Sequence, residues 1–294
     1  MKEFLDRLRR FTEVKTDEPM ACHTTFKIGG PARFFTEADS ADTVKEALRA
    51  AKEYSVKSYV IGSGSNLLVS DSGIDGRVRL MGRNFSSVKA EGEYIIAQAG
   101  AHLSKIARCA LDNSLAGFEF AAGIPGSLGG AVYMNAGAYG GEMSSVVAES
   151  TAIDENFDEI SVTDHAFGYR TSIYKDSEKV IIGAKIKLSS GSREEIKQTM
   201  ENLALRRREK QPLEFPSAGS VFKRPEGFYA GALIEGAMLK GECVGGAKVS
   251  EKHAGFIVNT GGATAEDVKK LIEIIKTRVY DKYKVLLETE IKFI

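Results

Sequence analysis

The 294-residue sequence predicts an α+β fold, because helical and strand-like segments are mixed without a steady βαβ alternation. Segment 39–54, "DSADTVKEALRAAKEY", has an apolar helical face behind Asp and Ser starters. "SYVIG" at 58–62 then has the composition of a short buried strand, and the middle third, about 146–188, is rich in strand-forming Val, Ile, Tyr and Thr. A chain of this length exceeds the usual single core, so two or three modules are expected.

The other elements follow from the same periodicities. The first ten residues, "MKEFLDRLRR", alternate charged and apolar positions and have no apolar signal-peptide core, so they predict an amphipathic helix. Thr264 with Asp267 has the spacing of a capping box in front of a long helix. The further predicted segments are a strand at 93–100, helices at 102–117, 193–211 and 265–283, and a closing strand at 284–294.

The closing segment "KVLLETEIKFI" carries an alternating pattern. Glu288, Glu290 and Lys292 share one predicted face, and the other face holds Val285, Leu287, Thr289, Ile291 and Phe293. A carboxylate is therefore held on a rigid strand, although the pattern alone favours a solvated face.

Composition excludes several classes of function. Lys+Arg and Asp+Glu are 40 each, so no net field favours nucleic acid or an anionic membrane. No run approaches the roughly 18 apolar residues of a membrane span. The three cysteines lack CxxC spacing and the four histidines form no HExxH or HxH pair, so neither a disulfide framework nor a metal site is expected, and a reducing cytoplasm fits best.

The segment "GSGSN", 62–66, directly follows the predicted strand at 58–62. Glycine lets backbone N–H groups approach a pyrophosphate without a Cβ in the way. A dinucleotide fingerprint would need a third glycine and a following helix, but Leu67 occupies that place and "LLVS" continues as strand. A Rossmann site is therefore not expected here.

A second glycine-rich stretch, "EFAAGIPGSLGGAVYMNAGAYG", covers 119–140. It lacks the Lys-Ser/Thr pair of a P-loop, and its apolar residues are too many for a flexible linker. A packed turn and a buried ligand cradle remain as alternatives on these grounds.

Seven ordered blocks carry a resemblance to a known family. The blocks "TTFKIGGPARFF", "IGSGSNLLV", "AGIPGSLGGAVYMNAGAYG", "GYRTSIY", "SAGSVFKRP", "GGAKVSEKHAGFIVN" and "LETEI" run from Thr24 to Glu290. In this order they resemble the MurB-type UDP-N-acetylenolpyruvoylglucosamine reductases, flavoenzymes of peptidoglycan synthesis. The chain is similar to the shorter, second type of that family, since no inserted tyrosine-bearing loop separates the central strands from the next helix.

The resemblance implies a two-lobed FAD-binding module of the vanillyl-alcohol-oxidase and p-cresol-methylhydroxylase kind, with lobes at 1–80 and 81–192. An α+β substrate-binding domain would follow at 193–294, and the final strand could pack back toward the lobes. The two glycine segments would hold the FAD pyrophosphate through backbone amides. The cofactor-binding residues implied in this way are Gly62, Ser63, Gly64, Ser65, Asn66, Gly123, Ile124, Pro125, Gly126, Ser127, Gly129 and Gly130.

The implied reaction reduces an enolpyruvyl ether to a lactyl ether, with NADPH as hydride source and FAD as relay. Three positions match the family's catalytic residues. Ser220 in "SAGSVFK" would donate the proton, while Arg170 in "GYRTS" and Glu290 on the last strand would stabilise charge that develops on the substrate carboxylate.

Substrate contacts are also implied by matching positions. The partner expected is a UDP-sugar, with no nucleic acid, membrane or obligate protein partner. An FAD-dependent alcohol oxidase of the same cofactor fold is the alternative enzyme, and a nucleotide-binding regulatory module is the alternative without chemistry. The substrate-binding residues implied are Tyr169, Lys210, Arg224 and His253.

Overall fold

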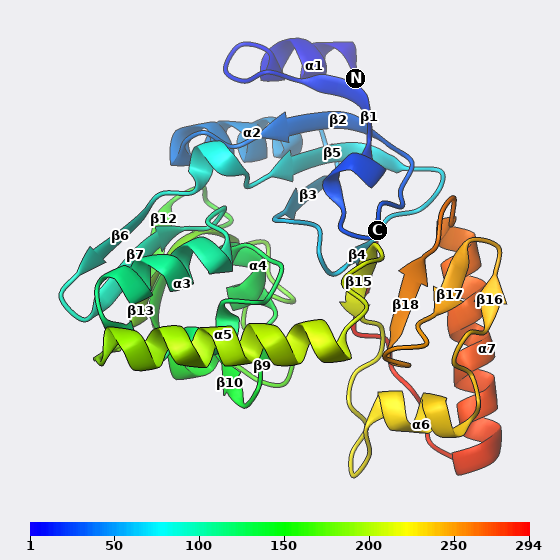
Figure 1. Cartoon of the computed structure of the whole chain (residues 1–294). Coiled ribbons are helices and arrows are strands. Elements are labelled where there is room, and N and C mark those ends of the chain that lie inside the picture. The colour runs from blue at the N-terminus through cyan, green and yellow to red at the C-terminus, as the bar shows by residue number, and fades with distance from the viewer. The chain divides into compact units, whose positions relative to one another are not determined.

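The computed structural model describes residues 1–294, and helices and strands are mixed along the chain as the sequence predicts (Figure 1). The chain groups into two compact units built from interleaved segments. Unit 1 contains Met1–Thr16, Phe34–Ser63 and Gly76–Arg207, and unit 2 contains Asp17–Arg33, Gly64–Asp75 and Arg208–Ile294. The division into three domains at residues 80 and 192 stays a prediction.

The first sheet has four strands in the order β1-β2-β5-β3. Helix α2 begins where expected, because the Ser40 hydroxyl accepts a hydrogen bond from the Thr43 amide and Thr43 completes the capping box. Its small residues pack with Phe4 and Phe34 in a core of their own. The elements of this region are α1 (Lys2–Leu8), β1 (Lys15–Pro19), β2 (Pro31–Glu37), α2 (Ala41–Glu53), β3 (Ser58–Ile61), β4 (Leu67–Leu68) and β5 (Ile74–Leu80).

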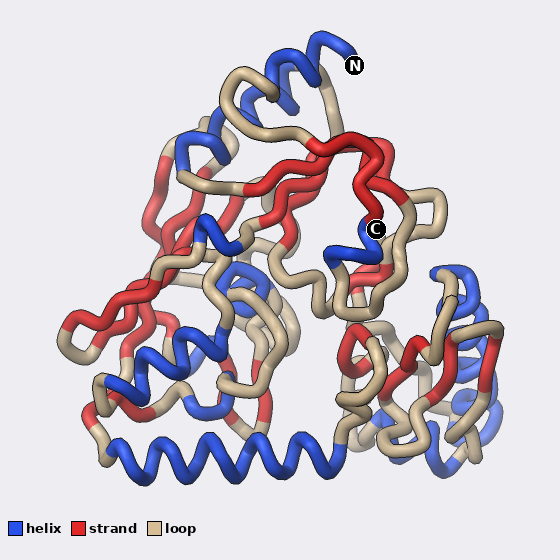
Figure 2. Tube along the Cα trace, turned by 45° about the horizontal axis from the view of Figure 1, so that its top comes forward, coloured by secondary structure: helices blue, strands red, loops and turns tan.

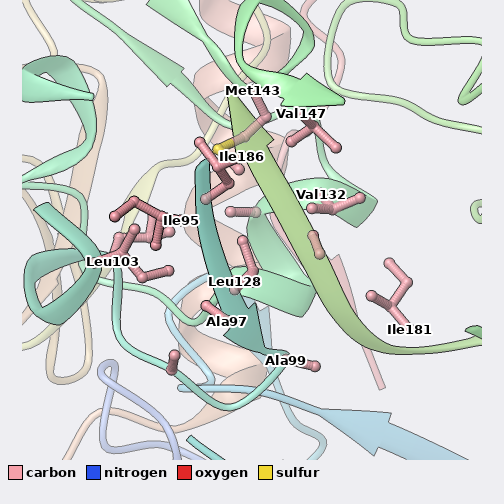
Figure 3. Packing of buried hydrophobic residues seen from close by; sticks show 14 of the residues in the cluster. Ile95, Ala97, Ala99, Leu103, Leu128, Val132, Met143, Val147, Ile181 and Ile186 are labelled. Atoms are coloured by element: carbon pink, nitrogen blue, oxygen red, sulfur yellow. The ribbon is translucent and has the colours of Figure 1, made fainter. Parts of the chain in front are cut away.

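The second sheet, in unit 1, is antiparallel and has the order β12-β11-β13-β7-β6. Helices α3 and α4 pack on it, and Figure 3 shows side chains of β7, α4 and β13 meeting in one apolar cluster. This cluster explains the predicted strand and helix periodicities. The elements are β6 (Val88–Glu91), β7 (Tyr94–Gln98), α3 (Leu103–Asp112), α4 (Leu128–Tyr133), β11 (Val147–Ile153), β12 (Glu159–Val162) and β13 (Val180–Lys187).

Helix α5 (Arg193–Lys210) is long and uninterrupted (Figure 2). Only Ile196 of its residues is buried, so most of the helix is solvated. The shorter elements nearby are η2 (Arg83–Phe85), β8 (Leu115–Ala116), η3 (Glu119–Ala121), β9 (Gly137–Ala138), β10 (Gly141–Glu142), η4 (Met143–Ser145) and β14 (Ser189–Ser190).

Unit 2 has a four-stranded sheet in the order β15-β18-β17-β16, with α6 and α7 beside it. The predicted capping box of α7 is confirmed, because the Thr264 hydroxyl accepts from the Asp267 amide and the Asp267 carboxylate accepts in return. The elements are η1 (Met20–His23), β15 (Ser217–Ser220), α6 (Ala230–Gly236), β16 (Cys243–Val244), β17 (Ala247–Val249), β18 (Phe256–Asn259), α7 (Ala265–Tyr283) and β19 (Lys292–Phe293).

The closing strand is shorter than predicted. Only β19 forms a ladder, parallel to β4, and an isolated bridge joins Phe222 to Thr289. The predicted faces are kept in part: Leu287 and Ile291 are buried and Glu288 is exposed, but Phe293 of the predicted apolar face is exposed. No helix of the chain combines the length and the apolar character that crossing a membrane would require.

Candidate active site

Arg170 lies at the tip of a two-residue turn in unit 1. The Gly168 amide donates to the Thr171 carbonyl at 3.1 Å, and the Thr171 amide donates back at 3.3 Å. Arg170 has φ +57°, at a turn position that normally selects Gly or Asn. Its Nη2 donates to the Gly137 carbonyl at 3.5 Å, and its guanidinium lies 5.0 Å from the exposed ring of Tyr169.

The glycine-rich stretch 119–140 packs against residues 99–101, which directly follow β7. The Leu128 amide donates to the Ala101 carbonyl and the Gly129 amide to the Ala99 carbonyl, both at 2.9 Å. A Cβ on Gly129 would lie 3.1 Å from the Ala99 Cβ, which is tighter than ordinary packing. Packing against Ala99 therefore gives Gly129 a structural reason to be glycine, and its contact with FAD stays a prediction.

Next to this contact, several polar groups have no partner in the protein. The Ser127 Oγ is buried and makes no hydrogen bond. The amides of Gly126, Ser127 and Gly130 donate to no protein group, and neither do those of Gly62 and Ser63. A Cβ on Gly62 would collide with the Ser127 Oγ, whereas Gly130 is exposed and has nothing nearer than 3.8 Å. The two predicted segments thus meet within unit 1 at Gly62 and Ser127, and each has unpaired amides near this contact.

Arg207 of α5 lies against the same stretch. A Cβ on Gly123 would be 3.4 Å from the Arg207 Cδ. Burial lowers the pKa of Arg207, which forms no ion pair, while Arg206 lies 4.9 Å from the Tyr139 ring. In the sequence, Arg207 is one of three consecutive arginines, and such a run usually forms a solvated helix face.

In unit 2, Ser220 and Glu290 lie on adjacent extended segments. Ser220 ends β15 and is half-buried, and its hydroxyl has no hydrogen-bond partner in the protein. The Glu290 amide donates to the carbonyl of Val221 at 2.7 Å. The Asn66 side chain donates to the Glu290 carbonyl at 3.2 Å. The structure therefore brings together a predicted proton donor, a predicted charge stabiliser and the end of the "GSGSN" segment.

Gly64 has a packing role as well. Its φ is +62°, and a Cβ there would collide with the carbonyl oxygen of His23. The Thr25 amide donates to the Gly64 carbonyl at 3.3 Å. The amides of Gly64, Ser65 and Asn66 donate to no protein group. The glycine is required by the fold, and the loop still presents unpaired amides.

The predicted substrate contacts are dispersed within their units. Lys210 is exposed at the end of α5, and the Arg224 guanidinium lies 4.0 Å from the centre of the Tyr229 ring. The His253 Nδ1 accepts a hydrogen bond from the Gly255 amide at 3.1 Å, and burial lowers the pKa of its ring. His253 therefore has a clear structural role, and its substrate contact stays a prediction.

Two other histidines, His102 and His165, lie near candidate site residues but were not predicted from the sequence, because the histidine spacing suggests no metal site. The His102 Nδ1 lies 3.4 Å from the Ser63 Oγ, beside the unpaired amides of unit 1. His165 is buried in the sheet that supports Arg170. Neither has a local sequence signal, since each partner is distant in sequence.

Two family models match separate parts of the chain. The model described as UDP-N-acetylenolpyruvoylglucosamine reductase, C-terminal domain, matches residues 211–294. The model described as FAD binding domain matches residues 32–156. The second match contains both the "GSGSN" segment and the amide-presenting part of the glycine-rich stretch, which confirms the expected FAD-binding module.

Solved structures give the same fold. The chain superposes on UDP-N-acetylenolpyruvylglucosamine reductase (MurB) from Thermus caldophilus with a TM-score of 0.83 and 33% identity, over 96% of this chain and 99% of that one. An alkyldihydroxyacetonephosphate synthase structure matches 65% of this chain and 41% of its own with a TM-score of 0.51 and 15% identity. The second match shows a shared fold only.

Two bacterial reductases match nearly the full length of the chain. The chain is 51% identical over 280 residues to the UDP-N-acetylenolpyruvoylglucosamine reductase of Caldanaerobacter subterraneus subsp. tengcongensis, covering 95% of this chain and 92% of the relative. It is 48% identical over 283 residues to that of Alkaliphilus oremlandii, covering 96% and 93%. On this identity and coverage, the chain belongs to the UDP-N-acetylenolpyruvoylglucosamine reductase family.

Proposed function

We propose that the chain reduces UDP-N-acetylglucosamine enolpyruvate to UDP-N-acetylmuramate with NADPH and FAD, and that Arg170, Ser220 and Glu290 carry the chemistry. Its family makes the chain an FAD-dependent oxidoreductase. The observation that carries the residue assignment is the half-buried Ser220, whose hydroxyl has no protein partner and whose neighbour Val221 holds the Glu290 backbone.

The residues of unit 1 fit the diphosphate of FAD. A buried hydroxyl without a partner costs free energy, about 1 to 3 kcal/mol, unless a ligand satisfies it. Such a hydroxyl, Ser127 Oγ, lies beside unpaired amides of Gly126 and Gly130 and near Gly62. Unpaired backbone N–H groups close together can bind anionic oxygens without any charged side chain. The half-buried Arg207 adds a cation close to Gly123.

The reaction requires a hydride at one vinyl carbon and a proton at the other. Bound FAD would supply the hydride chemistry, with NADPH as the source of the hydride. Ser220 then supplies the proton through its hydroxyl. A serine is a weak acid, so this role depends on a strongly basic acceptor and on the fixed position of the hydroxyl at the end of β15.

Arg170 and Glu290 act on the developing charge. The guanidinium of Arg170 is a permanent cation with paired donors, which suits a carboxylate whose charge increases during reaction. Glu290 is fixed through its backbone, because its amide bonds to Val221 and its carbonyl accepts from Asn66. These contacts fix the backbone from which the carboxylate extends, and electrostatic stabilisation requires such preorganisation.

The substrate is a UDP-sugar, and we assign its binding to Tyr169, Lys210, Arg224 and His253. The exposed Tyr169 ring and the Arg224–Tyr229 stack offer flat surfaces and cations suited to a nucleoside diphosphate. The product is a precursor of peptidoglycan, so we place the enzyme in the cytoplasm, where such nucleotide precursors are built.

An anaerobic two-step titration tests the proposal. The purified protein should be yellow, NADPH should bleach it, and the enolpyruvyl sugar nucleotide should restore the colour without oxygen. A preparation that stays colourless after incubation with FAD would overturn the cofactor assignment. Bleached enzyme that is reoxidised rapidly by oxygen, but not by the sugar nucleotide, would instead identify an oxidase.

A further inference from the structure

The backbone of Arg170 needs support from its surroundings. A non-glycine residue at φ +57° occupies a sparsely populated region of backbone conformation, which costs free energy. Two further residues of the same region, Asn135 at φ +43° and Ala166 at φ +44°, share this conformation. Such conformations persist only where neighbouring contacts fix the chain. The contacts around this turn therefore show what holds the Arg170 backbone in place.

A buried chain of hydrogen bonds lies beneath the turn. The Ser150 Oγ is 2.8 Å from the His165 Nε2 and 2.6 Å from the Tyr174 hydroxyl. Ser150 is 0% exposed, His165 4% and Tyr174 1%. The His165 ring also stacks on Phe167, with centroids 4.8 Å apart and an angle of 11° between the planes. We define these three hydrogen-bonded residues, Ser150, His165 and Tyr174, as the anchor network.

The direction of the hydrogen bonds follows from the burial. Desolvation lowers the pKa of His165, so its ring is neutral near pH 7, and the backbone of Thr163 hydrogen-bonds the ring as well. A neutral ring with one nitrogen donating to that backbone leaves Nε2 as an acceptor. Ser150 then donates to His165 and accepts from Tyr174. Every polar atom of the anchor network is used, which makes it rigid.

The anchor network holds both ends of the segment that carries Arg170. His165 precedes the turn and Tyr174 follows it, and both are fastened to Ser150 of β11. The Ile173 amide donates to the His165 carbonyl at 2.8 Å, which closes the base of the segment.

Two more contacts fasten the turn itself. The Asn135 side chain donates to the Gly168 carbonyl at 3.0 Å and accepts from the Ser144 amide at 2.9 Å. The Ser172 hydroxyl donates to the Tyr133 carbonyl at 2.8 Å. The turn is therefore held at its base and along its sides, and Arg170 lies at its tip.

We infer that Ser150, His165 and Tyr174 are positioning residues that fix Arg170 for the reduction of substrate. The inference rests on the proposed role of Arg170. The physical reason is that a small displacement of an aligned catalytic group lowers the reaction rate strongly, even when the group itself is intact. None of the three touches the candidate cofactor segments at 62–66 and 119–130 through any hydrogen bond of the structure.

The test uses Ser150→Ala and Tyr174→Phe in the FAD-loaded enzyme. Ser150→Ala removes both hydrogen bonds, and we expect it to slow flavin reoxidation by substrate about 10- to 100-fold. Tyr174→Phe keeps the ring and removes one bond, so its effect should be smaller. Bleaching by NADPH should be unchanged in both. Ser161→Ala, on exposed β12 of the same sheet, is the matched control and should behave as wild type.

A second readout does not depend on catalysis. Amide hydrogen exchange at Thr171, which donates to Gly168, should become faster in Ser150→Ala and Tyr174→Phe but not in Ser161→Ala. A double-mutant cycle completes the test. In the Arg170→Ala background, Ser150→Ala should cause no further loss in the substrate half-reaction, because the positioned group is gone.

The outcomes separate the inference from the proposed function. If Arg170→Ala itself reoxidises at the wild-type rate, the assigned role of Arg170 is wrong and the inference falls with it. If Arg170→Ala is slow but Ser150→Ala and Tyr174→Phe are not, only the inference is overturned. A full, additive loss in the double variant also overturns it, since the effect would then be general damage. Should Ser150→Ala fail to fold, Tyr174→Phe decides by the same criteria.

Discussion

The amide of Glu290 donates to the carbonyl of Val221 at 2.7 Å, which places the candidate charge stabiliser next to the candidate proton donor, Ser220. This pairing joins residues seventy positions apart in sequence and fixes both through the backbone. A backbone contact keeps its geometry when either side chain is changed. The roles of the two side chains can therefore be tested by substitution without moving the strands.

Ser220→Ala should separate the two half-reactions. Bleaching by NADPH should proceed at the wild-type rate, while reoxidation by substrate should slow by about 10² to 10⁴, the usual value of general acid catalysis. The control is Ser217→Ala at the other end of β15, whose backbone carbonyl, not its side chain, accepts from Thr25. Equal loss of both half-reactions in Ser220→Ala, measured by stopped-flow absorbance, would indicate structural damage instead.

Gly130→Ala distinguishes a ligand cradle from a packed turn. The added Cβ meets nothing nearer than 3.8 Å, and alanine favours a helix over glycine by about 1 kcal/mol, so the FAD-free protein should be as stable as wild type or more stable. If the unpaired Gly130 amide faces the diphosphate, the Kd for FAD should rise about tenfold or more. An unchanged Kd, measured by flavin fluorescence quenching, would show that Gly130 only completes the turn.

Gly62→Ala should act through packing. Its Cβ collides with the Ser127 Oγ, and forced overpacking usually costs about 1 to 3 kcal/mol of unfolding free energy. Ser127→Ala removes that oxygen, so adding it to Gly62→Ala should recover part of the lost stability. Urea unfolding of the FAD-free single and double variants measures this coupling. Strictly additive losses would mean that the two residues do not meet.

The regular elements were predictable because each packs its apolar face into a hydrophobic core, α3 into that of unit 1 and α7 into that of unit 2. The apolar positions of 102–117 and 265–283 are the buried faces of α3 and α7, and the capping residues Ser40 and Thr264 act as their local sequence suggests. A local sequence pattern is sufficient to predict a helix or strand where the surface that it packs against is apolar.

The site was less predictable because its constraints join distant residues. "GYRT" contains no residue that favours the left-handed conformation at Arg170, and the fastening comes from Ser150 and Asn135 on other elements. Likewise Gly62 and Gly64 are glycines because of Ser127 and His23, which no local pattern reveals. The resemblance supplied these positions, and the structure supplied the reason for several of them.

Arg77→Met should stabilise unit 1. Arg77 is 0% exposed, its Nε and Nη1 have no hydrogen-bond partner, and Nη2 reaches only the Ser58 hydroxyl. Burial, and then the charge of Arg79, lower the pKa of Arg77 to about 9. Replacing a buried charge by an apolar side chain of similar size often stabilises by about 1 to 4 kcal/mol. Arg108→Met, at an exposed position of α3, is the control and should change the urea midpoint little. A lower midpoint for Arg77→Met would show that the buried Arg77 charge stabilises the fold.

Stability should fall on mild acidification, in part through His165. Burial lowers the pKa of the folded ring, whereas in the unfolded chain the pKa returns to about 6.5. The unfolded state therefore binds more protons below about pH 6.5, so the stabilisation is complete above that pH and is lost as the pH falls through the folded pKa. Burial also lowers the pKa of His253, so its effect on stability has the same direction with pH. Urea unfolding at about pH 7.5 and 5.5 should show a smaller drop in His165→Gln than in wild type; an equal drop would mean that His165 does not titrate in this way.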